Sequence, residues 1–422
     1  MSKRLTYVIS SPHDTYSGYG ARSRDYIKSV IELDKYDVKL MSQRWGETAW
    51  GFCDNEPEWA FLKDYLLPDN KLQGKPDIWT QITIPNEFQP VGKYNIGVTA
   101  GIETTVCAGD WIEGMNRMDM NLVSSQHSKK VFEITQFEKK DKEKTIGHIK
   151  LEKPIEVLFE GLNLDTYKKL TPKEVSLDLS QIKESFCYLF VGHWMQGSYG
   201  HDRKNVGLLV KSFLETFKNQ KTKPALILKA SVGSSSYMSR EEILKRIKTL
   251  RKTVNSSNLP NIYVMNGDLS DSEMNELYNH PKVKAMLSFT KGEGYGRPLL
   301  EFSSIGKPII ASGWSGQVDF LHPEKSFLLG GELEPVHDSA ANKWILKESK
   351  WFKPDLSIVG GILKDMYKNY KSYVVKGKQQ GHYSRTNFSF DKMTELLGTY
   401  LDKYVSVPEE LELQLPKLEK ID

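Results

Sequence analysis

Short apolar runs alternate with amphipathic stretches along most of the chain. The first run is Leu5–Ile9, and apolar residues spaced three and four apart follow within Ala21–Leu33. The run predicts a buried strand, and the spacing predicts a helix. Gly18 and Gly20 lie between them and predict a loop that breaks the chain.

The same alternation continues through the first half of the chain. A helix is predicted over Ser128–Phe137, and the charged run Glu138–Lys150 is interpreted as a solvated face. Strands separated by helices in this way favour an α/β unit with a parallel sheet. The other strand-like runs are YDVKLMS, PDIWTQITIP, YNIGVTAG, MNLVSSQ and PIEVLFEG.

The pattern starts again near Phe186. Helices are predicted in NVGLLVKSFLETF, REEILKRIKTLRKTV and SDSEMNELYNH, the last with Ser270 or Ser272 as its N-cap. Strands are predicted in FCYLFVG, ALILKA, NIYVMNG, VKAMLSF and KPIIAS. Two similar α/β halves in tandem predict a cleft between them, at the carboxyl ends of their strands.

The length of 422 residues suits two domains. We expect an N-terminal domain over residues 1–175 and a C-terminal domain over residues 176–385. Residues 386–422 include the acidic tail SVPEELELQLPKLEKID. This segment is either a helix packed back on the N-terminal domain or a loose end.

Composition narrows the class of protein. Hydrophobic residues make up 39% and charged residues 27%, as in soluble globular proteins. No run approaches the roughly 20 apolar residues of a membrane span, and the apolar start is too short for a signal peptide. The three cysteines, Cys53, Cys107 and Cys187, are widely spaced and predict neither disulfides nor a metal site. We therefore expect a cytoplasmic protein without membrane insertion; its net charge of +4 allows a polyanionic partner without requiring one.

The stretch KGEGYGRPLLEFSSIGKPIIASGWSG carries the main candidate chemistry. Gly292, Gly294 and Gly296 follow a predicted strand, and Pro298 suits the first turn of the next helix. Backbone N–H groups at such a helix start bind phosphate, and glycines let a ligand approach them closely. A nucleoside diphosphate is therefore a reasonable ligand, and a plain strand-to-helix turn is the structural alternative.

Two glutamates in this stretch strengthen the functional interpretation. Glu301 is expected in the first turn of the helix, where the helix dipole favours an anion. Glu293 lies in the glycine turn, where a carboxylate beside a phosphate is unfavourable unless it binds hydroxyls. One carboxylate can accept hydrogen bonds from two vicinal sugar hydroxyls.

Other families with related patterns fit less well. A kinase glycine loop would be followed by H-R-D and D-F-G motifs, which the chain lacks. The turn, with Asp319 about twenty residues on, is similar to a dinucleotide fingerprint, but its glycine spacing differs. Glycosidases also use two carboxylates, yet phosphate-binding features surround this pair.

The motif EGYGRPLLE, from Glu293 to Glu301, resembles the paired-glutamate motif of family 4 of the retaining glycosyltransferases with the GT-B fold. KPIIASGWSGQVDFL, LFVGHWMQGSYGHDRKNVGLLVKSF and VLFEGLNLDTY, with Gly161, resemble other segments of that family. The similarity covers most of residues 1–330. It implies a GT-B fold of two Rossmann-like domains facing a central cleft, a donor that is a nucleoside diphosphate sugar, and neither metal nor cofactor.

The resemblance also implies roles for individual residues. Glu293 would hold hydroxyls of the transferred sugar and Glu301 those of the ribose. Arg203 and Lys204 would neutralise the diphosphate, where charge develops as the glycosidic bond breaks. Uridine diphosphate is the first guess for the carrier. The donor-binding residues that the resemblance implies are Gly18, Gly20, Glu293, Gly294, Tyr295, Gly296, Arg297, Pro298, Leu299 and Glu301.

The acceptor side departs from the family pattern. The family often has a histidine after an N-domain strand, whereas this chain has NIGVTAGIETT with Glu103 there. His13 is a second candidate, at the rim of the cleft. His127 follows the next strand, and a lone histidine of this kind is more often structural. Retention by front-face attack needs no protein nucleophile, because a diphosphate oxygen can take the acceptor proton.

SSPHDTYSGYGARSRD, TAGIETT and KGEGYGRPLLEFSSIGKP resemble glycosyltransferases of large tailed bacteriophages. This resemblance slightly favours hydroxymethylated cytosine in DNA as the acceptor, in the host cytoplasm. The basic runs LKRIKTLRK and YKNYKSYVVKGK suit phosphate contacts or a solvated face. A cell-surface glycan or its lipid-linked precursor is the alternative acceptor. A nucleotide-dependent dehydrogenase and a non-catalytic nucleotide-sugar-binding module are the remaining alternatives.

Overall fold

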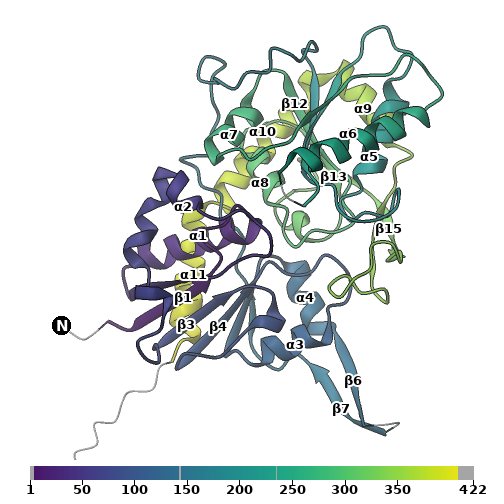
Figure 1. Ribbon diagram of the computed structural model, residues 1–422. Coiled ribbons are helices and arrows are strands. Elements are labelled where there is room, and N and C mark those ends of the chain that lie inside the picture. The colour runs from purple at the N-terminus through teal and green to yellow at the C-terminus, as the bar shows by residue number, and fades with distance from the viewer. Residues whose placement is uncertain (1–3, 142–143, 234, 407–422) are drawn as a thin grey trace, which may run out of the picture.

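The computed structural model describes residues 4–141, 144–233 and 235–406. The chain forms two α/β domains that face each other, one above the other in the view of Figure 1. Each domain is built on a parallel sheet of six strands with helices on its faces. This arrangement follows the two tandem halves of the hydrophobic pattern.

The first domain contains the strand order β2-β1-β3-β4-β5-β8, and every pairing in it is parallel. Its strands are β1 (Thr6–Ser11), β2 (Asp37–Ser42), β3 (Ile78–Ile82), β4 (Tyr94–Thr99), β5 (Met120–Val123) and β8 (Ile155–Val157). Its helices are α1 (Gly18–Glu32), α2 (Phe52–Asn55), α3 (Gly109–Asn116) and α4 (Gln126–Ile134), with 3-10 turns η1 (Pro57–Tyr65), η2 (Pro68–Asn70) and η3 (Pro85–Glu87). The order of strand addition reverses beside β1, which marks a ligand site at the carboxyl ends of such strands.

The second domain repeats this topology as β11-β10-β9-β12-β13-β14, again with parallel pairings only. Its strands are β9 (Cys187–His193), β10 (Ala225–Ser231), β11 (Ile262–Met265), β12 (Val283–Ser288), β13 (Ile309–Ser312) and β14 (Phe327–Leu329). Its helices are α5 (Val206–Phe217), α6 (Tyr237–Lys252), α7 (Asp271–Asn279), α8 (Arg297–Ser304), α9 (Val359–Lys368) and α10 (Tyr370–Asn387), with the 3-10 turn η4 (Gly316–Asp319). Ser270, one of the two predicted caps, begins α7 and forms a capping box with Glu273.

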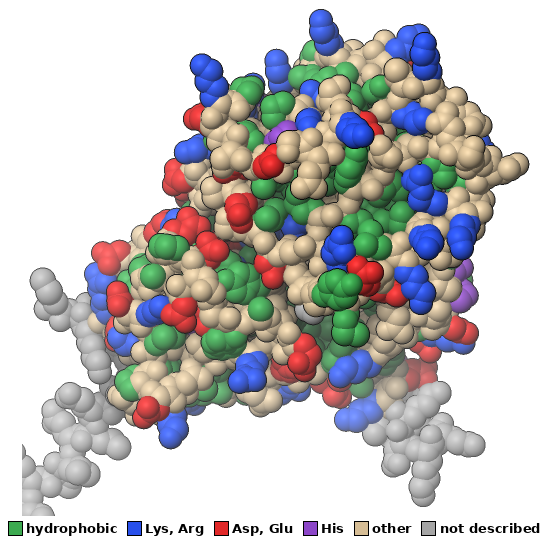
Figure 2. Space-filling view, turned by 45° about the horizontal axis from the view of Figure 1, so that its top comes forward, with side chains coloured by type: hydrophobic (Ala, Val, Ile, Leu, Met, Phe, Trp, Pro, Cys, Tyr) green, Lys and Arg blue, Asp and Glu red, His purple; other side chains and the backbone are tan. Residues whose placement is uncertain are grey.

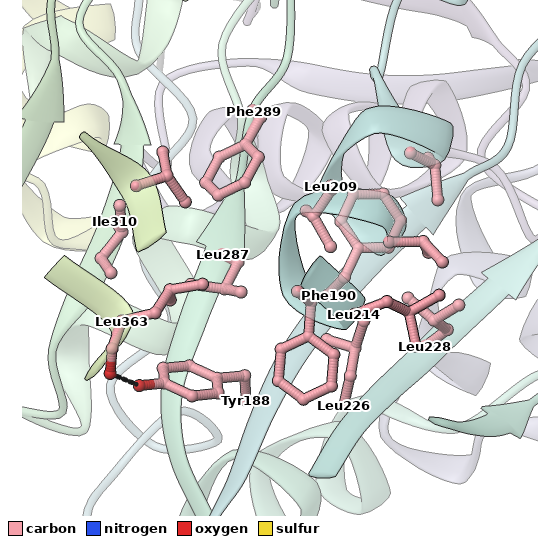
Figure 3. Packing of buried hydrophobic residues seen from close by; sticks show 14 of the residues in the cluster. Tyr188, Phe190, Leu209, Leu214, Leu226, Leu228, Leu287, Phe289, Ile310 and Leu363 are labelled. Atoms are coloured by element: carbon pink, nitrogen blue, oxygen red, sulfur yellow. Dashed lines mark hydrogen bonds between the residues drawn. The ribbon is translucent and has the colours of Figure 1, made fainter. Parts of the chain in front are cut away.

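The core of the second domain shows why the apolar runs became strands and helices. Apolar side chains of α5 and α9 pack on the face of the sheet formed by β9, β10 and β12 (Figure 3). Tyr188 of β9 lies in this core, and its hydroxyl donates to the carbonyl oxygen of Leu363 at 2.7 Å. The one polar group that Tyr188 brings into the core is thereby satisfied.

The last helix of the second half of the chain returns to the first domain. Helix α11 (Phe390–Tyr404) lies beside α1, and both belong to one hydrophobic cluster (Figure 1). Phe390, Met393, Leu397 and Leu401 form its buried stripe at the three- and four-residue spacing of an amphipathic helix. The acidic tail named above begins at Ser406, and its residues 407–422 lie outside the described residues.

Two antiparallel hairpins depart from the predicted pattern. The predicted helix over Ser128–Phe137 is α4, which ends at Ile134, so its last residues were wrongly assigned. The charged run that follows is not a plain solvated face but the hairpin of β6 (Gln136–Asp141) and β7 (Lys144–Lys150), which projects from the domain (Figure 1). The antiparallel pairing of the two strands satisfies their backbone N–H and C=O groups without a hydrophobic core. The sequence therefore shows no apolar pattern that would predict this hairpin.

A second hairpin, β15 (Gly331–Pro335) paired with β16 (Lys350–Pro354), follows β14. The segment joining its strands reaches the first domain. There Trp344 packs against Trp111, with ring centroids 5.6 Å apart. Thr105 N–H donates to the carbonyl oxygen of Lys350 at 2.9 Å, and Lys350 N–H donates to Thr105 Oγ1 at the same distance. These contacts tie the second domain to the first at one edge of the domain boundary.

Candidate active site

The glycine turn after β12 packs directly against the first domain. A Cβ atom on Gly292 would lie 1.8 Å from the carbonyl oxygen of Glu103, and one on Gly294 would lie 2.6 Å from that of Ala100. Gly296 has a φ of +104°, in the left-handed region that favours glycine. The turn therefore needs glycine at these positions, and it holds the intervening Glu293 at the boundary between the domains.

Helix α8 starts where the sequence predicts but places Glu301 differently. Gly296 is the N-cap, Arg297 the first helical residue and Pro298 the second. Glu301 is the fifth residue, so the expectation that it lies in the first turn is wrong. Because the dipole effect fades beyond the first turn, it does not account for this carboxylate.

Arg203 and Lys204, just before α5, bind Glu293. Lys204 Nζ donates to Glu293 Oε1 at 2.5 Å, and Arg203 Nη1 lies 3.3 Å from Oε2. Arg203 also donates to the carbonyl oxygen of Gly292 at 2.7 Å. The structure thus brings the predicted basic pair and the first glutamate of the motif into one group.

Burial and charge act against each other in this group. Burial alone would raise the pKa of Glu293, but Lys204 and Arg203 together lower it below its ordinary value. Burial would also lower the pKa of Arg203, but Glu103 and Glu293 together raise it. Glu293 is therefore ionised and Arg203 charged at neutral pH, so the pair is a true ion pair.

Glu103, the acceptor-side candidate of the first domain, belongs to the same group. Its Oε1 lies 3.5 Å from Arg203 Nη2, which makes it the contribution of the first domain to the ion cluster. The side chain of Glu103 is 31% exposed, whereas that of Glu293 is 9% exposed. Of these two carboxylates at the domain boundary, Glu103 is therefore the more exposed to solvent.

Glu301 lies in a second, deeper cluster. Arg297 Nε donates to Glu301 Oε1 at 2.9 Å, and the hydroxyl of Tyr278 donates to Oε2 at 3.0 Å. Arg297 also pairs with Asp25 of α1 and lies 3.8 Å from Glu160 Oε2. Arg297 therefore joins the helix of the glutamate motif to the first domain.

Arg297 is shared among three carboxylates, and burial has the larger effect on the charge state of Glu301. The pKa of Arg297 is raised well above its ordinary value because Asp25, Glu301 and Glu160 outweigh its burial. Burial raises the pKa of Glu301 to about 7, and Arg297 opposes this only in part. Glu301 therefore changes its charge near neutral pH.

His13 does not lie at an exposed rim. Its side chain is buried, its Nδ1 lies 3.2 Å from Ser11 Oγ and its Nε2 lies 3.3 Å from Ser42 Oγ. Burial lowers the pKa of His13 to about 4. The ring is thus neutral at neutral pH, and both nitrogens lie near serine hydroxyls; its role toward an acceptor stays a prediction.

Gly18 and Gly20 form no loop, so that prediction is wrong. Both lie in the first turn of α1, where the side chain of Ser17 caps the helix by accepting from Gly20 N–H at 2.9 Å. A Cβ atom on Gly20 would lie 2.3 Å from the carbonyl oxygen of Thr15, which explains that glycine by packing. Their role toward a donor stays a prediction.

The side chains of Tyr295 and Leu299 lie in the protein core and not at a ligand site. Both are buried in the hydrophobic cluster beneath α8. The hydroxyl of Tyr295 donates to the carbonyl oxygen of Glu160 at 3.2 Å, and its ring packs on Phe320. The backbone N–H of Leu299 is also engaged, because it donates to the carbonyl oxygen of Gly296 at 2.9 Å. The predicted backbone contact of Tyr295 with a diphosphate stays a prediction.

Sequence reasoning missed groups that meet across the domain boundary. Asp25 lies on α1 among charged positions that a helical pattern assigns to the surface, yet it is buried. His127 packs on Trp314 of the second domain, with ring centroids 4.6 Å apart, and burial lowers its pKa to about 4. No local signal identifies such residues, because their partners lie far away in the sequence.

No group of three or more His, Cys, Asp or Glu side chains within the described ranges is arranged to hold a metal ion. In the same part of the chain, no helix has both the length and the apolar character required to cross a bilayer. The three cysteines are buried and free.

Comparison with known proteins shows the fold. No protein-family model matches the sequence, and neither does any curated protein. HepE of Anabaena, solved with UDP and glucose, is 13% identical, with a TM-score of 0.56 over 95% of this chain and 100% of its own. A glycosyltransferase from Rickettsia africae is 14% identical, with a TM-score of 0.57 over 95% and 98%. Sucrose-phosphate synthase from Thermosynechococcus elongatus is 10% identical, with a TM-score of 0.60 over 95% and 99%. The expected GT-B fold of two Rossmann-like domains is confirmed.

Proposed function

We propose that this protein is a retaining, metal-independent glycosyltransferase of the family 4 type that uses a nucleoside diphosphate sugar, with UDP as the carrier. The observation that carries the proposal is the ion cluster of Glu293, Arg203 and Lys204 beside the start of α8. Two cations and the N–H groups of a helix start suit a diphosphate, and the carboxylate suits sugar hydroxyls. The complexes of the structural neighbour HepE with UDP and with UDP-glucose agree with this donor class.

In the free protein, Glu293 pairs with both cations, and Glu103 lies beside Arg203. A bound diphosphate would take over Arg203 and Lys204 and release Glu293 to accept hydrogen bonds from the sugar. As the bond between the anomeric carbon and the diphosphate oxygen breaks, the leaving diphosphate keeps the electron pair. The cations stabilise this growing charge, which is the type of interaction that accelerates a chemical step.

The acceptor oxygen forms the new bond on the face that the diphosphate leaves. Its proton passes to a diphosphate oxygen, so no protein nucleophile takes part. This route suits the site, because burial lowers the pKa of His13 to about 4 and so makes it a weak base, and both its ring nitrogens lie near serine hydroxyls. Glu103 faces solvent beside Arg203 and would orient the acceptor hydroxyl.

For the acceptor we propose hydroxymethylated cytosine in DNA, modified by a bacteriophage enzyme in the host cytoplasm. A pocket of about 360 Å³ at the end of β2 supports this choice, with Trp50 46% exposed in its wall. Aromatic side chains stack on bases, and a duplex base must be extruded before it can react. None of Gly18, Gly20 and Glu103 lines this pocket. The residues that do are Ser42, Arg44, Trp50, Leu66, Leu67 and Asn70.

Surface charge supports the DNA acceptor only weakly. Lys and Arg side chains are scattered over the face that Figure 2 shows, and several acidic side chains lie among them. The two basic runs of the sequence lie in α6 and in α9–α10, all in the second domain. For that reason the test includes glycans, the alternative acceptor class.

The test has two steps. A thermal-shift panel of nucleotide sugars first identifies the donor, because a bound ligand stabilises the folded state. Labelled donor is then incubated with hydroxymethylcytosine DNA, unmodified DNA and oligosaccharides. Label on the modified DNA alone supports the proposal. Label on glycans alone, or equally on both DNAs, refutes the DNA acceptor, and stabilisation by nicotinamide dinucleotides alone refutes the donor class.

A further inference from the structure

A cavity of about 890 Å³ lies in the second domain, and none of the expected donor-binding residues lines it. Its size is within the roughly 300–1,000 Å³ of small-molecule sites. One wall is the segment that leads into α5, and the other is the end of β14 with the hairpin that follows. The residues that matter here are Tyr199, Asn205 and Leu208 from the first wall and Glu334, Lys353 and Asp355 from the second.

Two ion pairs account for four of the charged side chains that line the cavity. Lys291 Nζ lies 2.5 Å from Glu334 Oε1, and Lys353 Nζ lies 3.4 Å from Glu332 Oε1. Asp355 is left without a cation among the described residues, and its Oδ1 accepts from Ser357 N–H at 2.9 Å. A phosphate or another anion would meet a net negative lining, so an uncharged ligand fits better.

Asn205 points to a ligand that both donates and accepts hydrogen bonds. It is 1% exposed, and neither its Nδ2 nor its Oδ1 makes a hydrogen bond to any residue that the structure describes. A buried polar atom without a partner costs about 1–3 kcal/mol. Hydroxyl groups donate and accept at once, so two neighbouring hydroxyls of one ligand would satisfy both atoms after a rotation of the amide.

Tyr199 adds an aromatic surface at the same place. It is 49% exposed, although it is a large aromatic side chain that folding normally buries. Leu208, next to it in the cavity wall, is apolar. This combination of groups suits a sugar. The half-exposed ring can pack on the C–H face of the sugar, and the carboxylates and the amide can bind its hydroxyls.

We propose that this cavity binds a neutral saccharide. The ring of Tyr199 packs on the face of a sugar, Asn205 exchanges hydrogen bonds with two of its hydroxyls, and Asp355 accepts from a third. The cavity also shares backbone with the candidate donor site, because Lys291 N–H donates to the carbonyl oxygen of Arg203 at 2.7 Å. The inference concerns binding alone and does not rest on the proposed function.

The test is saturation-transfer NMR without any nucleotide present. The probes are glucose, mannose, galactose, N-acetylglucosamine and lactose, with glucose 6-phosphate and inorganic phosphate as charged probes. The variants are Tyr199→Ala, at a half-exposed position, and Asn205→Gly, which keeps the φ of +56°. Tyr237→Ala, at a 75% exposed tyrosine of α6 that does not line the cavity, is the matched control, and thermal unfolding confirms that each variant is folded.

We expect at least one neutral sugar to bind, and each cavity variant to weaken it by about tenfold or more, which corresponds to about 1.4 kcal/mol. The control should bind the sugar as the wild type does. Binding by none of the neutral sugars overturns the proposal, as do a preference for phosphate, binding that survives both cavity variants, or binding lost only in Tyr237→Ala. Because no donor is present, these outcomes are independent of whether the protein transfers a sugar.

Discussion

Replacing Arg297 by Met should strongly destabilise the protein. The guanidinium is 17% exposed, and it is the cation next to Asp25 and Glu301, whose side chains are 4% and 9% exposed. Removing one partner of a buried ion pair costs about 3–5 kcal/mol, because the other charge stays buried. For a domain of this size, 1 kcal/mol lowers the unfolding temperature by about 2–4 °C. The expected loss is therefore on the order of 6–20 °C.

The loss should depend on pH in a defined direction. Without Arg297, nothing from this cation opposes the burial that raises the pKa of Glu301, so the folded state binds more protons than the unfolded state around neutral pH. Stability then falls as pH rises through this range. The deficit of Arg297→Met should be larger at about pH 8 than at about pH 5.5, and Asp25→Asn added to it should recover part of the loss.

Thermal unfolding by calorimetry at both pH values measures these effects. Arg246→Met is the matched control, because its ion pair with Glu242 is more exposed, at 28% and 41%. Such surface pairs contribute about 0–1 kcal/mol. Equal shifts for Arg297→Met and Arg246→Met would refute the reasoning, and so would a deficit that does not change with pH.

Three further predictions concern the donor. Lys204→Ala should lower turnover, measured as release of UDP, by about 100-fold or more; near wild-type release would remove Lys204 from the site. In binding titrations Glu301→Gln should weaken both bare UDP and the donor, whereas Glu293→Gln should weaken the intact donor selectively; equal losses in both variants would contradict these roles. The affinity for UDP should rise as pH passes through about 7, because burial raises the pKa of Glu301 and its ionised form accepts better from ribose hydroxyls. Glu301→Gln should flatten this profile, and a profile that persists in the variant would assign it to another group.

The sequence predicts both sheets because strands of a parallel sheet are buried on both faces. The first four residues of β10, Ala225 to Leu228, are buried, for example, and they form one apolar run. The glutamate motif and the basic pair were likewise visible, since the first follows β12 closely and the second lies just before α5. At these positions, the residues of the candidate site lie next to elements that the hydrophobic pattern predicts.

The hairpins and the contacts between domains were not predictable in this way. Strands β6 and β7 carry charges where a buried strand carries apolar residues, so their pattern resembles a surface segment. Asp25 and Arg297 are 272 positions apart, and only the packing of the two domains brings them together. The same packing buries Asp25 on a helix whose pattern assigns it to the surface.

The central claim is that Glu293, Arg203 and Lys204 form a donor site for a nucleoside diphosphate sugar. Calorimetric titration of the wild type and of Lys204→Ala with UDP, UDP-sugars and NAD tests it most directly. The account predicts that UDP and at least one UDP-sugar bind the wild type, and that Lys204→Ala weakens both. Binding of NAD in preference to every UDP-sugar, or identical UDP affinity in the two proteins, would contradict it.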